Sequence, residues 1–361
     1  MNLTRREFGR LAGAAALAGM LPKTQAEGRS IGWCIVGLGR ISMGHFMPGI
    51  KEGNTGRIVA LVSGHRPKAQ QQAAMYGVSD NAIYSYEDYD RIADNKEIDA
   101  VYIALPNGMH AEYTIRAAKA GKNVLCEKPM ATSVADSQAM IDACRTAGKK
   151  LMIAYRCQYS PIQLKAIQMI RSGQLGTVQA IESSFGFNIR AGEWRLNRKL
   201  SGGGPLMDVG IYSLNACRYL TGEEPEDIHA NSSVIDHDSR FTEVEENVGW
   251  TMKFPSGIVA SCNTTYGGNM NGFYRVHGSK GMIEMAPAFS YEGNHLHADL
   301  NGGQQVDMPE TEHDPDQFKT EADYFADCIW NNKEPKSDGE EGLRDMKYMS
   351  QIYQAAGLPS L

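Results

Sequence analysis

Short apolar runs alternate with longer amphipathic segments through the first part of the chain. The runs are rich in β-branched residues and predict strands over "WCIVGLG", "RIVALVSG", "IDAVYIALP", "KNVLCEKP" and "KLMIAYR". The segments between them predict helices over "RISMGHFMPGIKEG", "PKAQQQAAMYG", "HAEYTIRAAKAG" and "SVADSQAMIDACRTAG". Strand–helix alternation at this spacing predicts an α/β fold with a doubly wound parallel sheet over residues 27–153. The ligand site of such a sheet lies at the carboxyl ends of its strands.

From residue 154 to residue 361 the strand-like segments follow one another with tight turns between them. They are "TVQAIESSFGFNI", "DIHANSSVI", "EENVGWTMKF", "GIVASCNTTYG", "FYRVHGS" and "GMIEMA", with turns at "PSG" and "GSKG". Two late stretches, "FKTEADYFADCIWNN" and "EEGLRDMKYMSQIYQAAG", predict amphipathic helices. The stretches "HDPD" and "NHLHAD" are expected in loops. Residues 154–361 are therefore predicted to form a second domain, of the α+β class.

The amino terminus has the pattern of an export signal. Arg5, Arg6, Phe8 and Arg10 precede the apolar run "LAGAAALAGM", which is too short to span a membrane. Paired arginines at this place resemble a twin-arginine signal, which the twin-arginine export machinery recognises. Residues 1–26 are accordingly predicted to be a signal peptide, and the protein is expected in the periplasm. The alternative is a disordered basic segment.

Composition and charge exclude several classes of protein. The chain has 361 residues, a length that predicts two domains. Of these residues 42% are hydrophobic and 22% are charged, which is typical of globular proteins. A net charge of −6 argues against nucleic acid or an acidic membrane as a partner. The seven cysteines contain no C-x-x-C pair, so we expect buried thiols rather than a disulfide framework. The histidines show no metal-ligand spacing, and no metal site is predicted.

A glycine-rich turn follows the first predicted strand. Gly37 is expected to allow the tight turn, and Gly39 the close approach of a pyrophosphate to the backbone. Ser42 replaces the third glycine of the usual fingerprint. The following helix would direct its N–H groups at the ligand. Residues 27–153 are therefore predicted to be a dinucleotide-binding Rossmann domain, whose loop residues Gly37, Leu38, Gly39, Arg40 and Ile41 contact the cofactor.

The end of the second predicted strand selects the dinucleotide. Proteins that bind NAD place a carboxylate there for the ribose hydroxyls. This chain instead has "SGHRPK", which is expected to contact the cofactor through Ser63, Gly64, His65, Arg66 and Lys68. Two cations and no carboxylate favour a 2′-phosphate, so NADP is predicted rather than NAD. The alternative is a basic turn that is merely solvated.

Several motifs, in order, resemble one enzyme family. They are "ALPNGMH", "CEKP", "YRCQYSP", "EWRLNRKLSGGGPLMDVGIYSLN" and "GEEGLRDM". Together they resemble the glucose–fructose oxidoreductase/inositol dehydrogenase (Gfo/Idh/MocA) family, and within it the subgroup of glucose–fructose and aldose–aldose oxidoreductases. The resemblance implies that the second domain is built on a large open, mostly antiparallel sheet. It also implies a homodimer or homotetramer, in which that sheet pairs with its copy.

The resemblance assigns roles to the motif residues. Lys128, Asp208 and Tyr212 match the catalytic group. Tyr212 is expected to exchange a proton with the sugar, since a neighbouring cation, expected to be Lys128, would lower the pKa of its phenol. Asp208, four residues earlier on one helix face, would orient Lys128 or a sugar hydroxyl. Taken singly, these residues could be a salt-bridge partner of Glu127, a helix cap and a core tyrosine.

Other motif residues are assigned to the ligands. Predicted sugar contacts are Arg156, Tyr159 and Tyr291. Further cofactor contacts are predicted at Leu105, Pro106, Asn107, His110, Glu127, Lys128, Trp194 and Arg195.

Three functions remain open from the sequence. In the first, tightly bound NADP(H) carries hydride from an aldose, which becomes a lactone, to a second sugar, which becomes an alditol. In the second, an ordinary NADP-dependent aldose dehydrogenase exchanges its cofactor. In the third, a periplasmic sugar-binding protein keeps the nucleotide as a structural filler.

Overall fold

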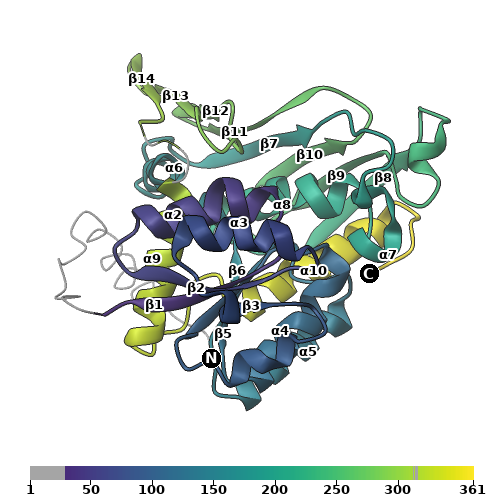
Figure 1. Ribbon diagram of the computed structural model, residues 1–361. Helices are drawn as coiled ribbons and strands as arrows, with labels where there is room; N and C mark the ends of the chain where they lie inside the picture. Colours follow the sequence, from purple (N-terminus) through teal and green to yellow (C-terminus); the bar gives the residue numbers. More distant parts are fainter. Residues whose placement is uncertain (1–28, 312, 314–315) are drawn as a thin grey trace. The chain divides into compact units, whose positions relative to one another are not determined.

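The computed structural model describes residues 29–311, 313 and 316–361 (Figure 1). The predicted twin-arginine signal, residues 1–26, lies outside the described residues. Within the described part of the chain, no helix is both long and apolar enough to cross a bilayer.

The first sheet contains six parallel strands. They are β1 (Ile31–Val36), β2 (Gly56–Val62), β3 (Ile83–Tyr84), β4 (Ala100–Ile103), β5 (Asn123–Glu127) and β6 (Leu151–Ala154), in the order β3-β2-β1-β4-β5-β6. Every residue of β1 and β4 is buried, as expected for a parallel sheet covered on both faces. The predicted doubly wound sheet of the Rossmann type is confirmed.

Helices cover both faces of this sheet. In Figure 1, α2 (Met47–Glu52) and α3 (Arg66–Tyr76) lie on one face, and α4 (His110–Lys119) and α5 (Val134–Thr146) on the other. The predicted first helix is not uniform, because a π-helical turn at Ser42–Phe46 precedes α2. Pro48 has no N–H to donate to the preceding turn, which explains the change of helix type there. Such turns are frequent at functional sites.

The second sheet has eight strands in the order β14-β13-β12-β11-β7-β10-β9-β8. Neighbouring strands are antiparallel except for β7 and β10, which confirms the predicted mostly antiparallel sheet. One face contacts α6 (Pro161–Arg171) and α8 (Ile211–Thr221), and alternate side chains on the other face are exposed. The strands are β7 (Val178–Gly186), β8 (Asp227–Ser233), β9 (Asn247–Lys253), β10 (Val259–Thr265), β11 (Met270–Gly278), β12 (Gly281–Met285), β13 (His295–Leu300) and β14 (Gln304–Pro309).

The prediction of a loop over "NHLHAD" is wrong, because most of it forms β13 at the end of this sheet. Its side chains alternate: Leu296 and Ala298 are buried, whereas His295 and His297 are partly exposed. That alternation was the signal for a half-buried strand.

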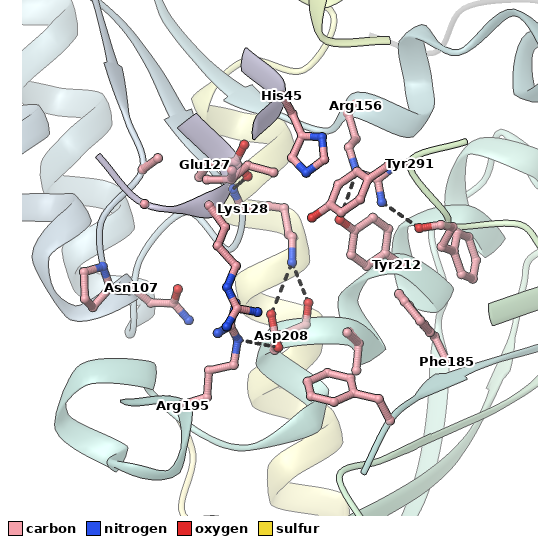
Figure 2. Close-up of a pocket in the computed structure, with 18 of the residues that line it drawn as sticks. His45, Asn107, Glu127, Lys128, Arg156, Phe185, Arg195, Asp208, Tyr212 and Tyr291 are labelled. Carbon is pink, nitrogen blue, oxygen red and sulfur yellow. Dashed lines mark hydrogen bonds and ion pairs between the residues drawn. The ribbon is translucent and has the colours of Figure 1, made fainter. Parts of the chain in front are cut away.

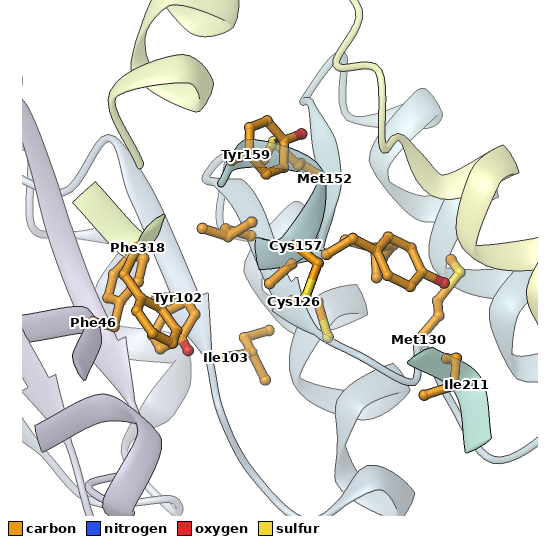
Figure 3. Packing of buried hydrophobic residues seen from close by; sticks show 14 of the residues in the cluster. Phe46, Tyr102, Ile103, Cys126, Met130, Met152, Cys157, Tyr159, Ile211 and Phe318 are labelled. Carbon is orange, nitrogen blue, oxygen red and sulfur yellow. Dashed lines mark hydrogen bonds between the residues drawn. The ribbon is translucent and has the colours of Figure 1, made fainter. Parts of the chain in front are cut away.

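Three more helices complete the fold: α7 (Arg198–Ser201), α9 (Asp316–Trp330) and α10 (Gly339–Ala355). Figure 3 shows Phe318 of α9 packed near Phe46 and Tyr102, whose rings stack at 3.6 Å. All seven cysteines lie among the described residues, where they are buried and form no disulfide bond, as expected. Buried hydrophobic residues of the first sheet, of the second sheet and of their helices form one continuous core.

A buried ion network fastens α8 to α10. The Arg218 guanidinium of α8 pairs with Glu341 and Asp345 of α10, and with Glu224 beyond the end of its own helix. Asn215 donates to Asp345 at 2.9 Å. Burial raises the pKa of Asp345 to about 6, although Arg218 opposes the rise. The network therefore holds the helix that carries Tyr212.

Replacing Arg218 by Met should destabilise the protein strongly, because it leaves the fully buried Asp345 carboxylate without a cation, whereas Glu341 and Glu224 keep Arg344 as a partner. We expect a loss of about 3–5 kcal/mol in the free energy of unfolding, measured by urea denaturation. Arg145→Ala is the control, because the Arg145 side chain is 65% exposed although it also pairs with carboxylates. It should cost less than about 1 kcal/mol. Equal losses in the two variants would contradict a role for the buried network.

Candidate active site

A cavity of about 930 Å³ lies between the carboxyl ends of the first sheet's strands and the elements around α8 (Figure 2). Ligand sites of doubly wound sheets occur at this edge. Most of the predicted site residues line the cavity: Gly39, Arg40, Ile41, Leu105, Pro106, Asn107, His110, Glu127, Lys128, Arg156, Trp194, Arg195, Asp208, Tyr212 and Tyr291. The others, Gly37, Leu38, Ser63, Gly64, His65, Arg66, Lys68 and Tyr159, do not line it.

The glycine loop has the geometry expected for a dinucleotide. Gly37 has φ +95°, and a Cβ there would lie 2.5 Å from the Ala104 carbonyl oxygen, so no other residue fits. A Cβ on Gly39 would instead point into open space, where a bound phosphate can approach the backbone. Ser42 is buried and donates to the Gly37 carbonyl at 2.6 Å, which fixes the turn. These residues fit a dinucleotide.

The turn after β2 lies beside this loop, because the Gly37 N–H donates to the Val62 carbonyl at 3.1 Å. The Lys68 ammonium donates to the Leu38 carbonyl at 2.7 Å. Arg66 is half exposed and pairs with Asp80 at 2.8 Å. His65 accepts a hydrogen bond from the Lys68 N–H and caps α3. The turn therefore places Lys68 against the glycine loop and directs Arg66, two residues earlier, towards Asp80, and neither cation lines the main cavity.

Two loops at the ends of β4 and β5 are joined by His110. Its ring nitrogens lie 2.9 Å from the carbonyl oxygens of Leu105 and Pro129. Burial lowers the pKa of His110. Asn107 donates to the Ser201 carbonyl at 2.8 Å, which ties the same region to α7. His110 and Asn107 thus hold the shape of the cavity wall that they line.

Asp208 stands at the centre of a charged cluster. Arg195 Nε and the Tyr266 hydroxyl donate to its Oδ2 at 2.8 and 2.9 Å. Lys128 Nζ donates to the Asp208 backbone carbonyl at 2.5 Å and lies 3.6 Å from Oδ1. Burial alone would raise the pKa of Asp208, but Arg195 and Lys128 lower it below its ordinary value. Asp208 therefore orients Lys128 as predicted, and Arg195 is its second partner.

Lys128 does not form the alternative ion pair with Glu127. Glu127 Oε1 accepts from the Tyr102 hydroxyl at 2.6 Å, and Oε2 accepts from the Lys128 backbone N–H at 3.2 Å. Burial raises the pKa of Glu127. The lysine side chain turns away from Glu127, towards Asp208.

The glycines before Asp208 serve close packing rather than a flexible approach. A Cβ on Gly203 would lie 2.1 Å from the Tyr353 hydroxyl of α10, and one on Gly204 would lie 2.4 Å from the Glu245 carbonyl oxygen. The chain then forms a π-helical turn, Leu206–Gly210, which runs into α8. Asp208 and Tyr212 both line the cavity, although Asp208 lies in this turn and not in the predicted regular helix.

The hydroxyl of Tyr212 has a different neighbour from the one predicted. Arg156 Nε donates to it at 3.2 Å, whereas Lys128 Nζ lies 4.6 Å from the ring centroid. Burial raises the pKa of Tyr212 above its ordinary value, and Arg156 opposes the rise. The expectation that Lys128 lowers this pKa is therefore not supported, because the ammonium faces the ring and Asp208.

Tyr291 lines the cavity, as a sugar contact should, and its ring stacks on His45 at 4.0 Å. Tyr159 does not, which contradicts its predicted role as a sugar contact. Its side chain is buried in the core (Figure 3). The hydroxyl bonds to Ser337 at 2.8 Å, and Lys336 Nζ lies 4.0 Å from the ring centroid.

Sequence reasoning missed an apolar and aromatic part of the wall. The missed lining residues are His45, Ala104, Phe185, Phe187, Ile189, Glu193, Val209, Phe289, Ser290 and Glu292, most of which are apolar or aromatic. Phe185 lies in β7, which was predicted as a strand, and Phe187 lies just beyond its end. Nothing in the alternation of this segment shows that its end faces a cavity. His45 and Tyr291 are far apart in the sequence, so no local signal pairs them.

Two family models match the chain. The first, described as an oxidoreductase family with an NAD-binding Rossmann fold, matches residues 31–155. The second, the GFO/IDH/MocA C-terminal domain, matches residues 163–284. The first range covers all six parallel strands, and the second begins in α6 and covers most of the second sheet.

Individual relatives agree with these models. D-xylose 1-dehydrogenase (NADP+) of Haloarcula marismortui is 30% identical over 347 residues, 92% of each chain. The crystal structure of aldose-aldose oxidoreductase from Caulobacter crescentus with glycerol has a TM-score of 0.88 and 45% identity, over 91% of this chain and 98% of that one. A 3-ketoreductase from Actinomadura kijaniata, solved with NADP and TDP-benzene, has a TM-score of 0.80 at 22% identity, over 91% and 98% of the chains, and shows the fold alone.

The two family models together match most of the described residues, and the relatives match nearly the whole chain. The chain belongs to the GFO/IDH/MocA family of NAD(P)-binding oxidoreductases.

Proposed function

We propose that the protein is a sugar oxidoreductase that keeps NADP(H) tightly bound. It oxidises an aldose at C1 to the lactone and passes the hydride to a second sugar, an aldose or a ketose, which becomes an alditol. The two sugars use the same cavity in turn, so the kinetics are ping-pong. The 45% identity to an aldose-aldose oxidoreductase and the likeness to a D-xylose 1-dehydrogenase support this substrate class.

One observation carries the proposal: an ammonium and a phenol meet in one cavity, next to a loop that fits a dinucleotide. Lys128 Nζ is held by Asp208, and Tyr212 presents its hydroxyl beside Arg156. Removing hydride from an alcohol carbon requires a proton acceptor at its oxygen, and the reverse reaction requires a proton donor there. The cavity supplies a group for both directions.

The residues act on one sugar oxygen. When bound, NADP(H) supplies the nicotinamide carbon that accepts and returns the hydride. During oxidation, ionised Tyr212 takes the proton of the C1 hydroxyl; during reduction, its hydroxyl returns that proton to the carbonyl oxygen of the second sugar. Lys128 donates a hydrogen bond to the same sugar oxygen, while Asp208 keeps the ammonium in place. The proton balance closes over the two halves, so no net proton leaves the site.

The turn after β2 supports NADP over NAD as the cofactor. Lys68 contacts the glycine loop, Arg66 lies two residues before it in the same turn, and the segment from Ser63 to Lys68 contains no carboxylate that would repel a 2′-phosphate. A guanidinium binds a phosphate through charge-assisted hydrogen bonds. Arg66 would then share its charge between the cofactor and Asp80.

Export of the protein would give a reason for a resident cofactor. We propose that residues 1–26 direct the folded protein, with its nucleotide, through the twin-arginine pathway to the periplasm. Without fresh NADP, an exported dehydrogenase would stop after one turnover. A second sugar that takes the hydride back regenerates the oxidised cofactor inside the protein, so cofactor exchange is unnecessary.

We also propose that the open face of the second sheet pairs with a second copy, in a homodimer or homotetramer. Alternate residues on that face, such as Thr251 of β9 and Ser261 of β10, are exposed. A broad sheet face that no helix covers is a natural surface for a two-fold contact.

A second candidate is an ordinary NADP-dependent aldose dehydrogenase with exchanging cofactor. The match to D-xylose 1-dehydrogenase (NADP+) over 92% of the chain favours it. It would use the same residues but release NADPH into solution.

The two candidates differ in the nucleotide that the purified protein carries. Protein taken from the periplasmic fraction and denatured should release an equimolar amount of NADP(H), measured by chromatography. Incubated with mixed sugars and no added nucleotide, it should form lactone and alditol in equal amounts. Protein that is empty, and that forms product only in proportion to added NADP, would contradict the resident cofactor and favour the dehydrogenase.

Lys128→Ala and Tyr212→Phe should each slow hydride transfer by roughly 10²–10⁴-fold, because each removes a group that acts on the reacting oxygen. The measurement is the single-turnover change in nicotinamide absorbance after sugar is added. Tyr219→Phe is the control, since Tyr219 lies on the same helix but outside the main cavity. If the unmodified protein and both site variants bind sugar equally well and none of them shows an absorbance change, the protein is instead a sugar-binding protein with no hydride transfer.

A further inference from the structure

Arg156 is held more rigidly than a sugar-binding side chain needs to be. It is 5% exposed and follows β6 in a short helical turn, Arg156–Tyr159. Its terminal nitrogens donate to the carbonyl oxygens of Phe289 and Ser290 at 2.6 and 3.0 Å, and to Gln317 Oε1 at 2.7 Å. Its Nε donates to the Tyr212 hydroxyl at 3.2 Å. Four of its five N–H groups are thus used by protein acceptors.

Aromatic rings fix the guanidinium in the same position. Its central carbon lies 4.5 Å from the ring centroid of Tyr291 and 5.1 Å from that of Tyr212. Tyr291 in turn stacks on His45, so the group forms a continuous set of contacts across the cavity wall (Figure 2). Arg156 cannot swing towards a ligand without breaking these contacts.

The charges on the two cations near Tyr212 are not equivalent. Lys128 lies 3.6 Å from the Asp208 carboxylate, which balances its charge. Within the described residues Arg156 has no carboxylate within 4.0 Å, and the four groups that accept its hydrogen bonds are neutral. The buried carboxyl groups of Glu127 and Glu321 feel its charge from farther away, and burial raises the pKa of both, which favours their neutral forms. An unbalanced cation in a buried place favours an anion beside it far more than a balanced one does.

The other ionisable groups near Tyr212 oppose its ionisation or leave it little changed. Burial of the ring and the neighbouring Cys157 and Glu127 raise the pKa of Tyr212, whereas the charge and hydrogen bond of Arg156 lower it. The ionisable groups that face Tyr212 come from three places: Glu127 and Lys128 at the end of β5, Arg156 and Cys157 after β6, and Tyr291 in the loop before β13.

We propose that Arg156, and not Lys128, is the positioning residue that fixes the Tyr212 hydroxyl and favours its ionised form. Lys128, held in place by Asp208, is then free to bind the sugar hydroxyl that loses its proton to Tyr212. This division of roles rests on the proposed function, because it assumes that Tyr212 exchanges the proton. It replaces the prediction that Arg156 contacts the sugar.

The ionisation of Tyr212 can be measured without turnover. A fluorotyrosine placed at position 212 in the full-length protein is more acidic than tyrosine, and its ¹⁹F resonance follows the phenol through a pH titration. In Arg156→Met the midpoint should rise by about 1–3 pH units, because the favourable cation is lost. Lys128→Met should raise it less, and Arg145→Met, which removes an exposed arginine outside the cavity, should leave it unchanged.

Two milder variants cover the case in which Arg156→Met does not fold, as judged by circular dichroism. Arg156→Lys keeps the charge and should give a smaller rise than loss of the charge. Gln317→Leu removes one acceptor that holds the guanidinium and should also raise the midpoint. The proposal is overturned if the Arg156 and Gln317 variants leave the midpoint unmoved, or if Lys128→Met raises it more than they do.

Failure of the proposed function would look different. If the unmodified protein transfers no hydride between sugars, the proposed function is wrong, but the fluorine titration still reports on Arg156. If it is active, the pH dependence of hydride transfer should move to higher pH in the Arg156 variants. The turnover number should fall while KM for the sugar changes little, which a sugar contact at Arg156 would not produce.

Discussion

The Asp208 carboxylate is the interaction on which the rest of the site depends. It pairs with Lys128, which follows β5 of the first sheet. It also accepts hydrogen bonds from Arg195 and Tyr266, which belong to the other half of the molecule. Removing one partner of a largely buried ion cluster is costly, because it leaves a charge without compensation. Asp208 therefore fixes the distance between the nucleotide-binding half and α8, and with it the place of Tyr212.

Two departures from regular helix geometry serve the same cavity. The π-helical turn at Ser42–Phe46 carries His45 to the cavity, and the turn at Leu206–Gly210 carries Asp208. Both begin close to glycines that permit tight contacts, at Gly37 and at Gly203 and Gly204. The backbone positions that tolerate only glycine are therefore close in sequence to the residues that line the cavity.

The sequence predicts best what depends on local pattern. Alternating strands and helices predict the parallel sheet, and the segment from Gly37 to Ser42 predicts the glycine loop that fits a dinucleotide. Spacing along the chain determines both features. The meeting of Lys128, Asp208 and Tyr212 follows from motifs in a known order. The predictions that fail concern where individual side chains point. Tyr159 follows Arg156 by three residues, yet its ring packs in the core instead of lining the cavity.

Charge pairing was the least predictable part of the site. The sequence cannot show that Lys128 turns to Asp208 and leaves Glu127 to Tyr102, because both carboxylates are available to a lysine in an extended loop. Nor can it show that Arg156 contacts Tyr212, since their contact depends on the loop at Phe289 and on Gln317 of α9. Only the packing of distant segments decides these partners.

The most direct measurement follows the hydride itself. An aldose deuterated at C1 is mixed with an unlabelled acceptor sugar and a large excess of unlabelled NADPH, and the alditol is analysed by mass spectrometry. If the nucleotide stays in the protein, the alditol should carry the deuterium undiluted. An alditol that takes its hydrogen from the free NADPH, with the deuterium lost to the nucleotide pool, would contradict hydride transfer within a closed site.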